Sequence, residues 1–359
     1  MPLTGLRVIE LARILAGPWI GQTLADLGAD VVKVESPQGD ETRNWGPPFI
    51  GDSAAYFHAA NRGKRGMTCD FRNPAQLAAL KAEIARADVV IENFKRGDLA
   101  RYGLDYQSLA VDNPGLIHAS VTGFGQDGPK ADLPGYDLLI QGASGIMDLT
   151  GDPDGPPQKV GVAWIDIITG LYGVIAVQAA LAERSRSGLG QQIDLSLMDC
   201  AVAALANQAM NALAGAAPRR MGNAHPNIVP YQVFPASDGH IIIACGSDRQ
   251  FAALAQALGD PTLAADPAYA TNAQRVAARD TVVARISVLT APLTRAEITA
   301  RLQAAGVPGG PINSVAEALA DPQVQARGVV IAPEGTPGIR TPIRFSRSRL
   351  HLSRAAPRR

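Results

Sequence analysis

Hydrophobic and polar positions at the start of the chain follow a strand–helix–strand pattern. Short apolar runs at 6–11 and 29–35 predict two β-strands. Between them, residues 19–27 have apolar positions at helical spacing, and Gly28 provides a helix stop. A strand, a helix and a second strand in this order predict a parallel sheet.

The same alternation continues to residue 214. It predicts helices at 73–87, 106–113, 166–184 and 198–214, and strands at 88–92, 116–121 and 191–197. We therefore predict an α/β fold, with a Rossmann-like large domain over roughly the first half of the chain.

The pattern changes near Gly215. A loop rich in Pro, Gly and Asn precedes a predicted hairpin of strands 231–234 and 240–245, and helices are predicted at 248–258, 272–290 and 295–305. This order predicts a small α+β domain. The strand-like, Pro- and Arg-rich region from Asp321 has no core of its own, so we expect it to dock on a part that is already folded.

Composition argues against several classes of protein but does not identify the function. The 359 residues include 33 basic and 33 acidic side chains, so no net charge attracts nucleic acid. Three dispersed cysteines predict neither disulfides nor a zinc site, and the N-terminus lacks a signal-peptide pattern, so we expect a cytoplasmic protein. Residues 160–182 are apolar over the length of a membrane span, but Asp166 interrupts them, which favours a buried core helix.

Gly123–Gly128 (GFGQDG) formally matches the glycine fingerprint of dinucleotide-binding proteins. That fingerprint must open a helix whose N-terminus meets the pyrophosphate. Here Pro129 follows at once and Pro134 comes soon after. No helix can begin there, so the sequence argues against a nicotinamide or flavin enzyme.

A cationic and aromatic loop follows the predicted strand 88–92. Glu92–Arg101 reads ENFKRGDLAR, and loops after parallel strands are where α/β folds bind ligands. Its amide, aromatic and cationic side chains suit a phosphorylated nucleotide, although a solvated turn fits equally well without further context. We expect Lys64, Arg65 and Arg72 to be surface charges, or phosphate ligands where a pocket exists.

Asp166 is the only carboxylate between Val160 and Ala182. As a helix N-cap it would bond first-turn amides and be held ionised by the helix dipole. As a nucleophile it would be poorly hydrated, fixed in place and anionic, with Gly170 and Gly173 leaving room beside it. The residues alone leave these two interpretations open.

An ordered set of motifs resembles the class III CoA-transferases and the related α-methylacyl-CoA racemases. The motifs are LAGP, GADVVKVE, NRGKRG, ENFKRG, SVTGFGQDGP, GYD and DIITG, and the likeness spans essentially the whole chain. The resemblance implies an interlocked homodimer with its active site between the large domain of one chain and the small domain of the other. It implies a large Rossmann-like CoA-binding domain at 1–190 and 322–359, a helical linker at 191–225 and a small α+β domain at 226–321.

The resemblance also implies covalent chemistry at Asp166. The family's aspartate attacks an acyl-CoA thioester, and an aspartyl anhydride and an aspartyl-CoA thioester follow; coenzyme A thioesters are substrates, and no metal or tightly bound cofactor is implied. By position, the implied CoA-binding residues are Leu15, Ala16, Arg72, Asn93, Phe94, Lys95, Arg101, Tyr136 and Asp137.

Tyr136 favours a transferase over a racemase. Racemisation needs two proton-transfer groups, and the racemases carry His where this chain has Tyr136, a side chain that does not titrate near neutral pH. A protein that binds CoA thioesters without catalysis is a further alternative, but it would not need a buried carboxylate. Leu15 and Ser36 differ from the glutamine and basic residue of transferases that act on formyl-CoA and oxalate.

The loop 219–232 resembles that of succinyl-CoA-dependent, dicarboxylate-using members. Arg219, Arg220 and His225 could bind the distal carboxylate of succinate or a similar acid. An ordinary basic interdomain linker explains the same residues equally well. We therefore expect the partners of this protein to be an acyl-CoA, a carboxylic acid and a second copy of itself, but neither nucleic acid nor a membrane.

Overall fold

The computed structural model describes all residues, 1–359, and divides them into two compact units. The first unit comprises 1–147, 159–218 and 322–359, and the second comprises 148–158 and 219–321. Helix α6 (Ile146–Leu149) spans one junction between them.

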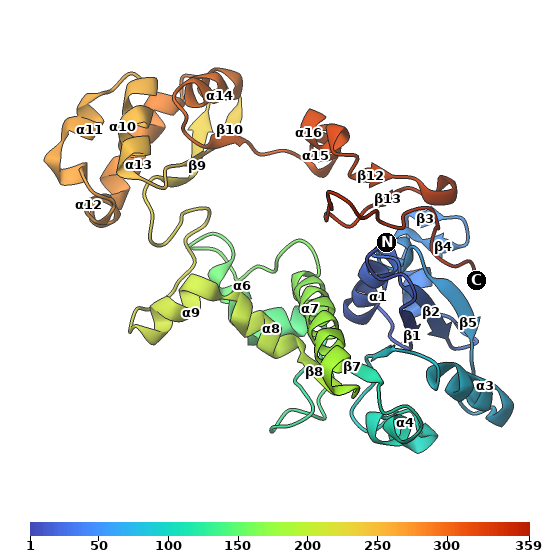
Figure 1. Ribbon diagram of the computed structural model, residues 1–359. Coiled ribbons are helices and arrows are strands. Elements are labelled where there is room, and N and C mark those ends of the chain that lie inside the picture. The colour runs from blue at the N-terminus through green and yellow to red at the C-terminus, as the bar shows by residue number, and fades with distance from the viewer. The chain divides into compact units, whose positions relative to one another are not determined.

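A six-stranded parallel sheet forms the centre of the first unit (Figure 1), in the order β5-β2-β1-β6-β7-β8. Its strands are β1 (Arg7–Glu10), β2 (Asp30–Glu35), β5 (Arg65–Thr68), β6 (Val89–Glu92), β7 (Ile117–Thr122) and β8 (Gln192–Ser196). The predicted parallel α/β fold is confirmed, and the strand order reverses between β1 and β6.

Helices cover both faces of this sheet. On one face, Ile20 of α1 (Ala16–Asp26) and Val177 of α7 (Trp164–Ser187) share a core with the strand residue Val8. On the other face, α3 (Pro74–Ile84) and α4 (Tyr106–Asp112) pack against a second core. The remaining elements of this unit are η1 (Glu41–Asn44), β3 (Phe49–Ile50), β4 (Ser53–Ala54), α2 (Ala55–Asn61), η2 (Ala100–Tyr102), α5 (Asp137–Ala143), α8 (Leu197–Ala204), α9 (Ala206–Leu213), α16 (Pro322–Ala326), β12 (Val330–Ile331), η4 (Pro333–Gly335) and β13 (Gly338–Ile339).

Helix α7 has the length and apolar composition of a membrane span, a weak signal for a single helix. It packs on α1 and contacts β7 and β8, as a core helix does. The other side of α7 is uncovered in the single chain, where the side chains of Leu171, Tyr172 and Ile175 are 48%, 46% and 63% exposed.

The stretch 191–225, expected to be a helical linker, is divided in the structure. β8 pairs with β7 at the edge of the sheet, and 191–218 belongs to the first unit. The single helix predicted at 198–214 is two helices, α8 and α9, because Ala206 has a φ of 46° and interrupts the helical backbone.

The second unit has an antiparallel sheet in the order β11-β10-β9. Its elements are β9 (Tyr231–Ala236), β10 (Gly239–Ala244), α10 (Asp248–Ala257), α11 (Thr262–Ala265), η3 (Pro267–Tyr269), α12 (Asn272–Ala277), α13 (Arg279–Thr290), α14 (Arg295–Ala304), β11 (Gly309–Pro311) and α15 (Val315–Ala320). Phe234, Ile241, Phe251 and Ile286 belong to its own hydrophobic core. The hairpin prediction is confirmed, whereas the helix predicted at 272–290 is divided at Ala278.

The C-terminal segment 322–359 docks on the first unit, mainly through backbone groups. The buried Asp26 carboxylate accepts from the amide of Thr341 at 3.2 Å, and the Arg62 guanidinium donates to the carbonyl of Ile339 at 2.8 Å. The segment contains only two short strands, β12 and β13, fewer than its strand-like sequence predicts.

Candidate active site

The point where the strand order reverses carries a cavity of about 230 Å³. The segment after β1 and the segment after β6 both line it, together with residues that follow β7 and the start of α7. Open α/β sheets bind ligands in this crevice, outside the carboxyl ends of the strands.

Asn93 joins the two segments across the crevice. Its side chain accepts from the backbone amide of Arg13 at 2.9 Å and donates to the carbonyl of the same residue at 2.7 Å. The next residue, Ile14, has a φ of 69°, a strained conformation for a β-branched side chain. The backbone at Arg13 and Ile14, which lines this side of the cavity, is therefore held in a strained conformation.

Asp166 lines the cavity but does not cap its helix. α7 begins at Trp164, and Oδ1 of Asp137 accepts from the amides of Ile165 and Asp166 at 2.8 and 3.2 Å. Oδ2 of Asp137 in turn accepts from the side-chain amide (Nε2) of Gln141 at 2.5 Å. The N-cap interpretation of Asp166 is wrong, because Asp137, from α5, satisfies these amides.

The environment of Asp166 favours its neutral form. Burial, and secondly the charge of Asp137, raise the pKa of the Asp166 carboxyl from 3.8 to about 7. The expectation that the helix dipole holds it fully ionised is wrong, because a nearby like charge and desolvation both oppose ionisation.

Gly170 and Gly173 serve helix packing rather than open space for a ligand. A Cβ on Gly170 would lie 2.9 Å from Cβ of Trp19, and one on Gly173 would lie 2.3 Å from Cδ1 of Ile20. The two glycines therefore bring α7 close against α1, which fixes Asp166 relative to the segment after β1.

Most of the predicted site residues of the first unit line this one cavity. They are Leu15, Ala16, Asn93, Phe94, Lys95, Tyr136, Asp137 and Asp166. Tyr136 is 63% exposed, while both ends of the Asn93 amide and the carboxylate of Asp137 already bond the protein. Asn93 and Asp137 thus shape the cavity as well as line it.

Arg72 and Arg101 lie outside this cavity. Arg72 lines a second cavity of about 430 Å³, whose walls include Phe71, Phe94 and Tyr102. Phe94 lines both cavities. Arg101 pairs with Asp98 at 3.4 Å and lies 5.1 Å from the ring centroid of Tyr102.

Comparison with known proteins matches residues 3–359 to the CoA-transferase family III. The chain belongs to that family. It is 54% identical to a succinate–glutarate CoA-transferase of Agrobacterium fabrum, over 99% of this chain and 92% of the relative. It is 40% identical to a mouse succinyl-CoA:glutarate CoA-transferase, over 92% and 76% of the two chains. A CAIB/BAIF family crystal structure from Brucella suis matches with a TM-score of 0.90 and 59% identity, covering 100% and 96% of the two chains.

The resemblance drawn from the motifs is confirmed, and the protein is a family III CoA-transferase. Its substrates are therefore CoA thioesters. Gly123 does not open a helix: it packs against Gly135, so closely that a Cβ on Gly123 would lie 2.5 Å from Cα of Gly135, and helix α5 begins only at Asp137.

 

No helix begins between the end of β7 at Thr122 and Asp137, so the segment has no helix N-terminus to meet a pyrophosphate. The prediction that Gly123–Gly128 does not open a helix is therefore confirmed.

Tyr56 of α2 is a neighbour of Asp166 and Asp137 that sequence reasoning missed, although it does not line the cavity. Burial, and then the charges of Asp166 and Asp137, raise the pKa of the Tyr56 hydroxyl to about 12. Tyr56 therefore lies within electrostatic range of both carboxylates, and its ring packs 5.2 Å from that of Trp45. The surrounding AAYFHAAN reads as an ordinary apolar helix, so the sequence carries no signal for this role.

Glu92 is a second residue that sequence reasoning missed. Its buried carboxyl group bonds the backbone of the segment after β6. It is 5% exposed, accepts from the amide of Phe94 at 2.8 Å and also accepts from the hydroxyl of Ser120. Burial raises the pKa of its carboxyl to about 7.

Lys64 is not a surface charge as expected from NRGKRG. It is 1% exposed, and its ammonium donates to Glu10 at 2.8 Å and to Asn61 at 2.8 Å. Arg65, the next residue, does lie on the surface, where it pairs with Asp30 at 2.7 Å.

Arg219, Arg220 and His225 all belong to the second unit. Arg220 pairs with Asp148 at 3.1 Å, and the His225 ring lies 5.2 Å from that of Tyr231. Burial, and then the charge of Arg279, lower the pKa of His225. Arg279, which sequence reasoning missed, is thus a further cation beside this histidine.

Proposed function

We propose that the enzyme exchanges CoA between succinyl-CoA and glutarate or a similar dicarboxylate, with Asp166 as the covalent nucleophile. The observation that carries this proposal is the position of Asp166, a desolvated carboxylate in the crevice of a CoA-transferase fold. The names of the two glutarate-using relatives support the choice of acids.

The reaction begins when an oxygen of the Asp166 carboxylate attacks the thioester carbonyl. The carbon–sulfur bond breaks, CoA leaves as the thiolate, and an aspartyl–succinyl anhydride remains. The thiolate then attacks the aspartyl carbonyl, which releases succinate and leaves an aspartyl-CoA thioester.

The acceptor acid reverses these steps. Its carboxylate attacks the aspartyl thioester and expels the thiolate, which then attacks the acceptor's carbonyl and frees the Asp166 carboxylate. Each step exchanges one acyl bond for another, so no electrons are gained or lost. Because water would hydrolyse the anhydride, the cavity must exclude it during this sequence.

The cavity that contains Asp166 and the neighbouring cavity that contains Arg72 suit the two ends of an acyl-CoA. Phe71, Phe94 and Tyr102 give the larger cavity aromatic walls for the adenine ring, and Arg72 supplies a cation for phosphate. We assign the thioester end to the smaller cavity, beside Leu15 and Ala16, because Asp166 lines it. Lys95 and Arg101 are assigned to the phosphates.

We assign the distal carboxylate of the dicarboxylate to the cations of the second unit. Arg279 has a buried nitrogen, Nη1, without a hydrogen-bond partner, and so does Arg220 at Nε. With Arg219 and His225, these groups supply several donors for one carboxylate.

This assignment predicts a change in specificity. His225→Ala and Arg279→Met should each raise KM for glutarate about tenfold, and should change KM for a monocarboxylate of similar length much less. Steady-state kinetics with both acids will measure this. Equal KM values in variant and parent for every dicarboxylate would remove these residues from the substrate site.

We also propose an interlocked homodimer, as the family resemblance implies, and a cytoplasmic location, as the dispersed cysteines and the N-terminal sequence suggest. Exposed large apolar side chains on α5, α7 and α9 support a buried interface in the assembly: Leu138, Leu139, Leu171, Ile175, Met210 and Leu213. In this dimer the first unit of one chain and the second unit of its partner form each active site.

Mass spectrometry tests the covalent step directly. Protein incubated with succinyl-CoA and then treated with hydroxylamine or borohydride should carry a modification at Asp166 that is absent from Asp166→Asn. No modification with any acyl-CoA of a panel, together with deuterium exchange at the substrate's α-carbon, would instead indicate proton-transfer chemistry.

A further inference from the structure

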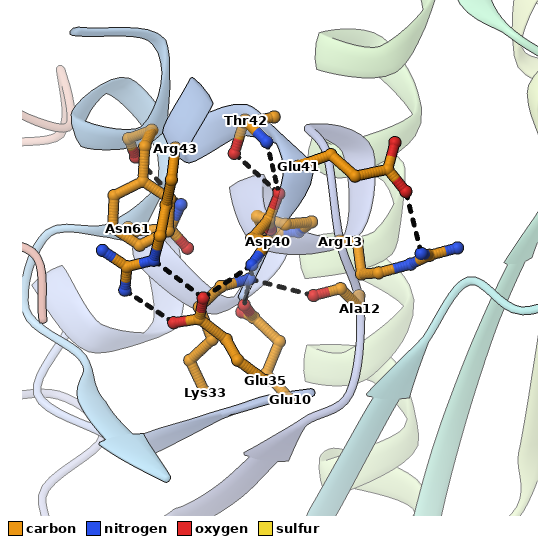
Figure 2. A network of polar contacts seen from close by, with 12 residues as sticks. Glu10, Ala12, Arg13, Lys33, Glu35, Asp40, Glu41, Thr42, Arg43 and Asn61 are labelled. Carbon is orange, nitrogen blue, oxygen red and sulfur yellow. Dashed lines mark hydrogen bonds and ion pairs between the residues drawn. The ribbon is translucent and has the colours of Figure 1, made fainter. Parts of the chain in front are cut away.

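Beneath the segment after β1 lies a buried cluster of Glu10, Lys33, Asp40 and Lys64, here called the lysine–carboxylate cluster; Figure 2 shows the first three with their neighbours. All four are at most 1% exposed. Two ammonium groups face two carboxylates, with Lys33 2.9 Å from Asp40 and Lys64 2.8 Å from Glu10.

The two lysines also hold two backbone carbonyls. Lys33 donates to the carbonyl of Ala12 at 3.0 Å, and Lys64 donates to the carbonyl of Pro18 at 2.9 Å. Oε1 of Glu10 lies 3.5 Å from the first ammonium and 2.8 Å from the second, so one carboxylate ties both together. The cluster thus binds the backbone on both sides of residues 13–17, at Ala12 and at Pro18.

Residues 13–16 all line the cavity that contains Asp166. Within them, Ile14 is strained at a φ of 69°. At the end of this span, a Cβ on Gly17 would lie 2.3 Å from Cβ of Ala12, which shows how closely the segment folds back on itself. Such a backbone persists only where its surroundings hold it.

Helix α1 leaves space for the cluster at one position. A Cβ on Gly21 would lie 1.7 Å from Oε2 of Glu10 and 3.3 Å from Cε of Lys64. The helix that starts at the cavity wall therefore packs directly on the cluster.

Fold stability alone is a weak reason for such a cluster. Buried ion pairs lose much of their attraction to desolvation, and well-packed apolar groups often replace them without loss of stability. What an apolar group cannot do is donate to the carbonyls of Ala12 and Pro18.

We propose that Lys33 and Lys64 are positioning residues that, through Glu10, hold residues 13–17 in the strained shape needed for acyl transfer at Asp166. This inference rests on the proposed function, in which that cavity receives the thioester. The lysines do not touch the substrate, and their effect reaches it through the backbone.

The test uses full-length protein carrying Lys64→Met and Glu10→Gln together, which removes one charge of each sign. Hydrogen–deuterium exchange of residues 11–19 should become about tenfold faster. Single-turnover acylation of Asp166 at saturating succinyl-CoA should fall about tenfold or more, because small misplacements of a reacting group are costly.

A third substitution separates positioning from loss of stability. Glycine adopts positive φ without strain, so adding Ile14→Gly should restore acylation about threefold in the double variant. A merely structural cluster predicts no such recovery, because glycine adds flexibility to a weakened protein.

The matched control is Arg62→Met with Asp26→Asn. This pair is also buried, with a 2.6 Å contact, but its guanidinium donates to Ile339 in the C-terminal segment. Exchange at 11–19 and acylation per folded molecule should stay within about twofold of the parent.

Three results would overturn the proposal: unchanged exchange at 11–19 in the double variant, unchanged acylation per folded molecule, or no recovery with Ile14→Gly. If the parent protein forms no adduct at Asp166, the proposed function fails. Acylation then reports nothing on the cluster, and exchange at 11–19 alone decides whether it holds the segment.

Discussion

The Asp166 carboxyl is placed where its charge is unfavourable. Burial and the charge of Asp137 raise its pKa to about 7, so roughly half of the groups are ionised at neutral pH. A carboxylate with a raised pKa is more basic and less solvated, which favours attack on a carbonyl. The residue gains reactivity at the cost of a smaller ionised fraction.

This environment predicts a pH dependence for acylation. Because only the carboxylate attacks, the single-turnover rate should rise with pH through about 7 and then level off. Asp137→Asn removes the like charge and should move the midpoint to lower pH. Rapid-quench measurements between about pH 5.5 and 8.5 will check both, and a flat profile in the parent protein would contradict the assignment.

The same carboxyl should make the folded protein less stable as pH rises. Its folded pKa of about 7 lies above 3.8, the ordinary value of an aspartate, so between these two pH values the folded state binds more protons than the unfolded state. Asp166→Asn does not titrate, and its stability advantage over the parent should grow by about 2 kcal/mol between pH 5 and pH 7. Denaturant unfolding of both proteins measures this. An equal difference at both pH values would show that the pKa of Asp166 is not raised.

Among single residues, the sequence predicts those site residues that belong to a family motif. It does not predict the residues whose role depends on contacts with distant parts of the chain. Asp166 and the ENFKRG loop follow from the motifs. Nothing in the sequence shows that Asp137 caps α7 from another helix, or that Tyr56 lies near both carboxylates. Lys64 looks like a solvated charge in NRGKRG because its partners, Glu10 and the carbonyl of Pro18, are distant in the chain.

Among the elements, α1 and α7 determine the geometry of the site through their close packing. Gly173→Ala would place a methyl group 2.3 Å from Cδ1 of Ile20, which must move. The higher helix propensity of alanine offsets about 1 kcal/mol of the cost of this clash. We therefore expect a net loss of roughly 1–2 kcal/mol in the free energy of unfolding, and slower acylation. Thermal unfolding and single-turnover kinetics will measure both.

The variant Gly142→Ala is the matched control, since its Cβ would meet only Sδ of Met147 at an ordinary 3.7 Å. It should be neutral or stabilising. Adding Ile20→Val to Gly173→Ala removes Cδ1, the nearer of the two clashing atoms of Ile20, and should recover part of the loss. No recovery would mean that another contact separates the helices.

Periodic elements of the fold are predictable from the sequence, whereas those that depend on distant contacts are not. β1, β2, β6 and β7 are short apolar runs and were predicted. β5 was missed because RGMT has no alternation and becomes a strand only by pairing with β2. The break between α8 and α9 occurs at Ala206, where no glycine or proline marks it.

At the scale of the whole molecule, the proposed sharing of each active site between two chains predicts complementation between two impaired chains. Asp166→Asn and His225→Ala chains, co-expressed with different tags, should form hybrid dimers with one site that has both residues intact. With glutarate well below the parent's KM, activity of the purified hybrid should then exceed that of either homodimer and approach about half that of the parent per dimer. Sites built within single chains would leave the hybrid no more active than its homodimers.

If the exposed face of α7 lies in the interface of the proposed homodimer, a charge placed on that face should dissociate the dimer. Ile175→Glu places a charge on a side chain that is 63% exposed in the single chain and buried in the proposed dimer. Light scattering after gel filtration should show monomers or a dimer weakened about tenfold or more. Val111→Glu, on α4 at 79% exposure, is the control and should remain dimeric.

The division of the chain has a consequence for the order of events during synthesis. All six strands of the large sheet lie before residue 197, yet the partners of Asp26 and Arg62 lie in the C-terminal segment, which is translated after the second unit. The second unit, mostly continuous between the strands and that segment, therefore leaves the ribosome before the segment does. A nascent chain can complete its small unit while its large unit still lacks the C-terminal partners of Asp26 and Arg62.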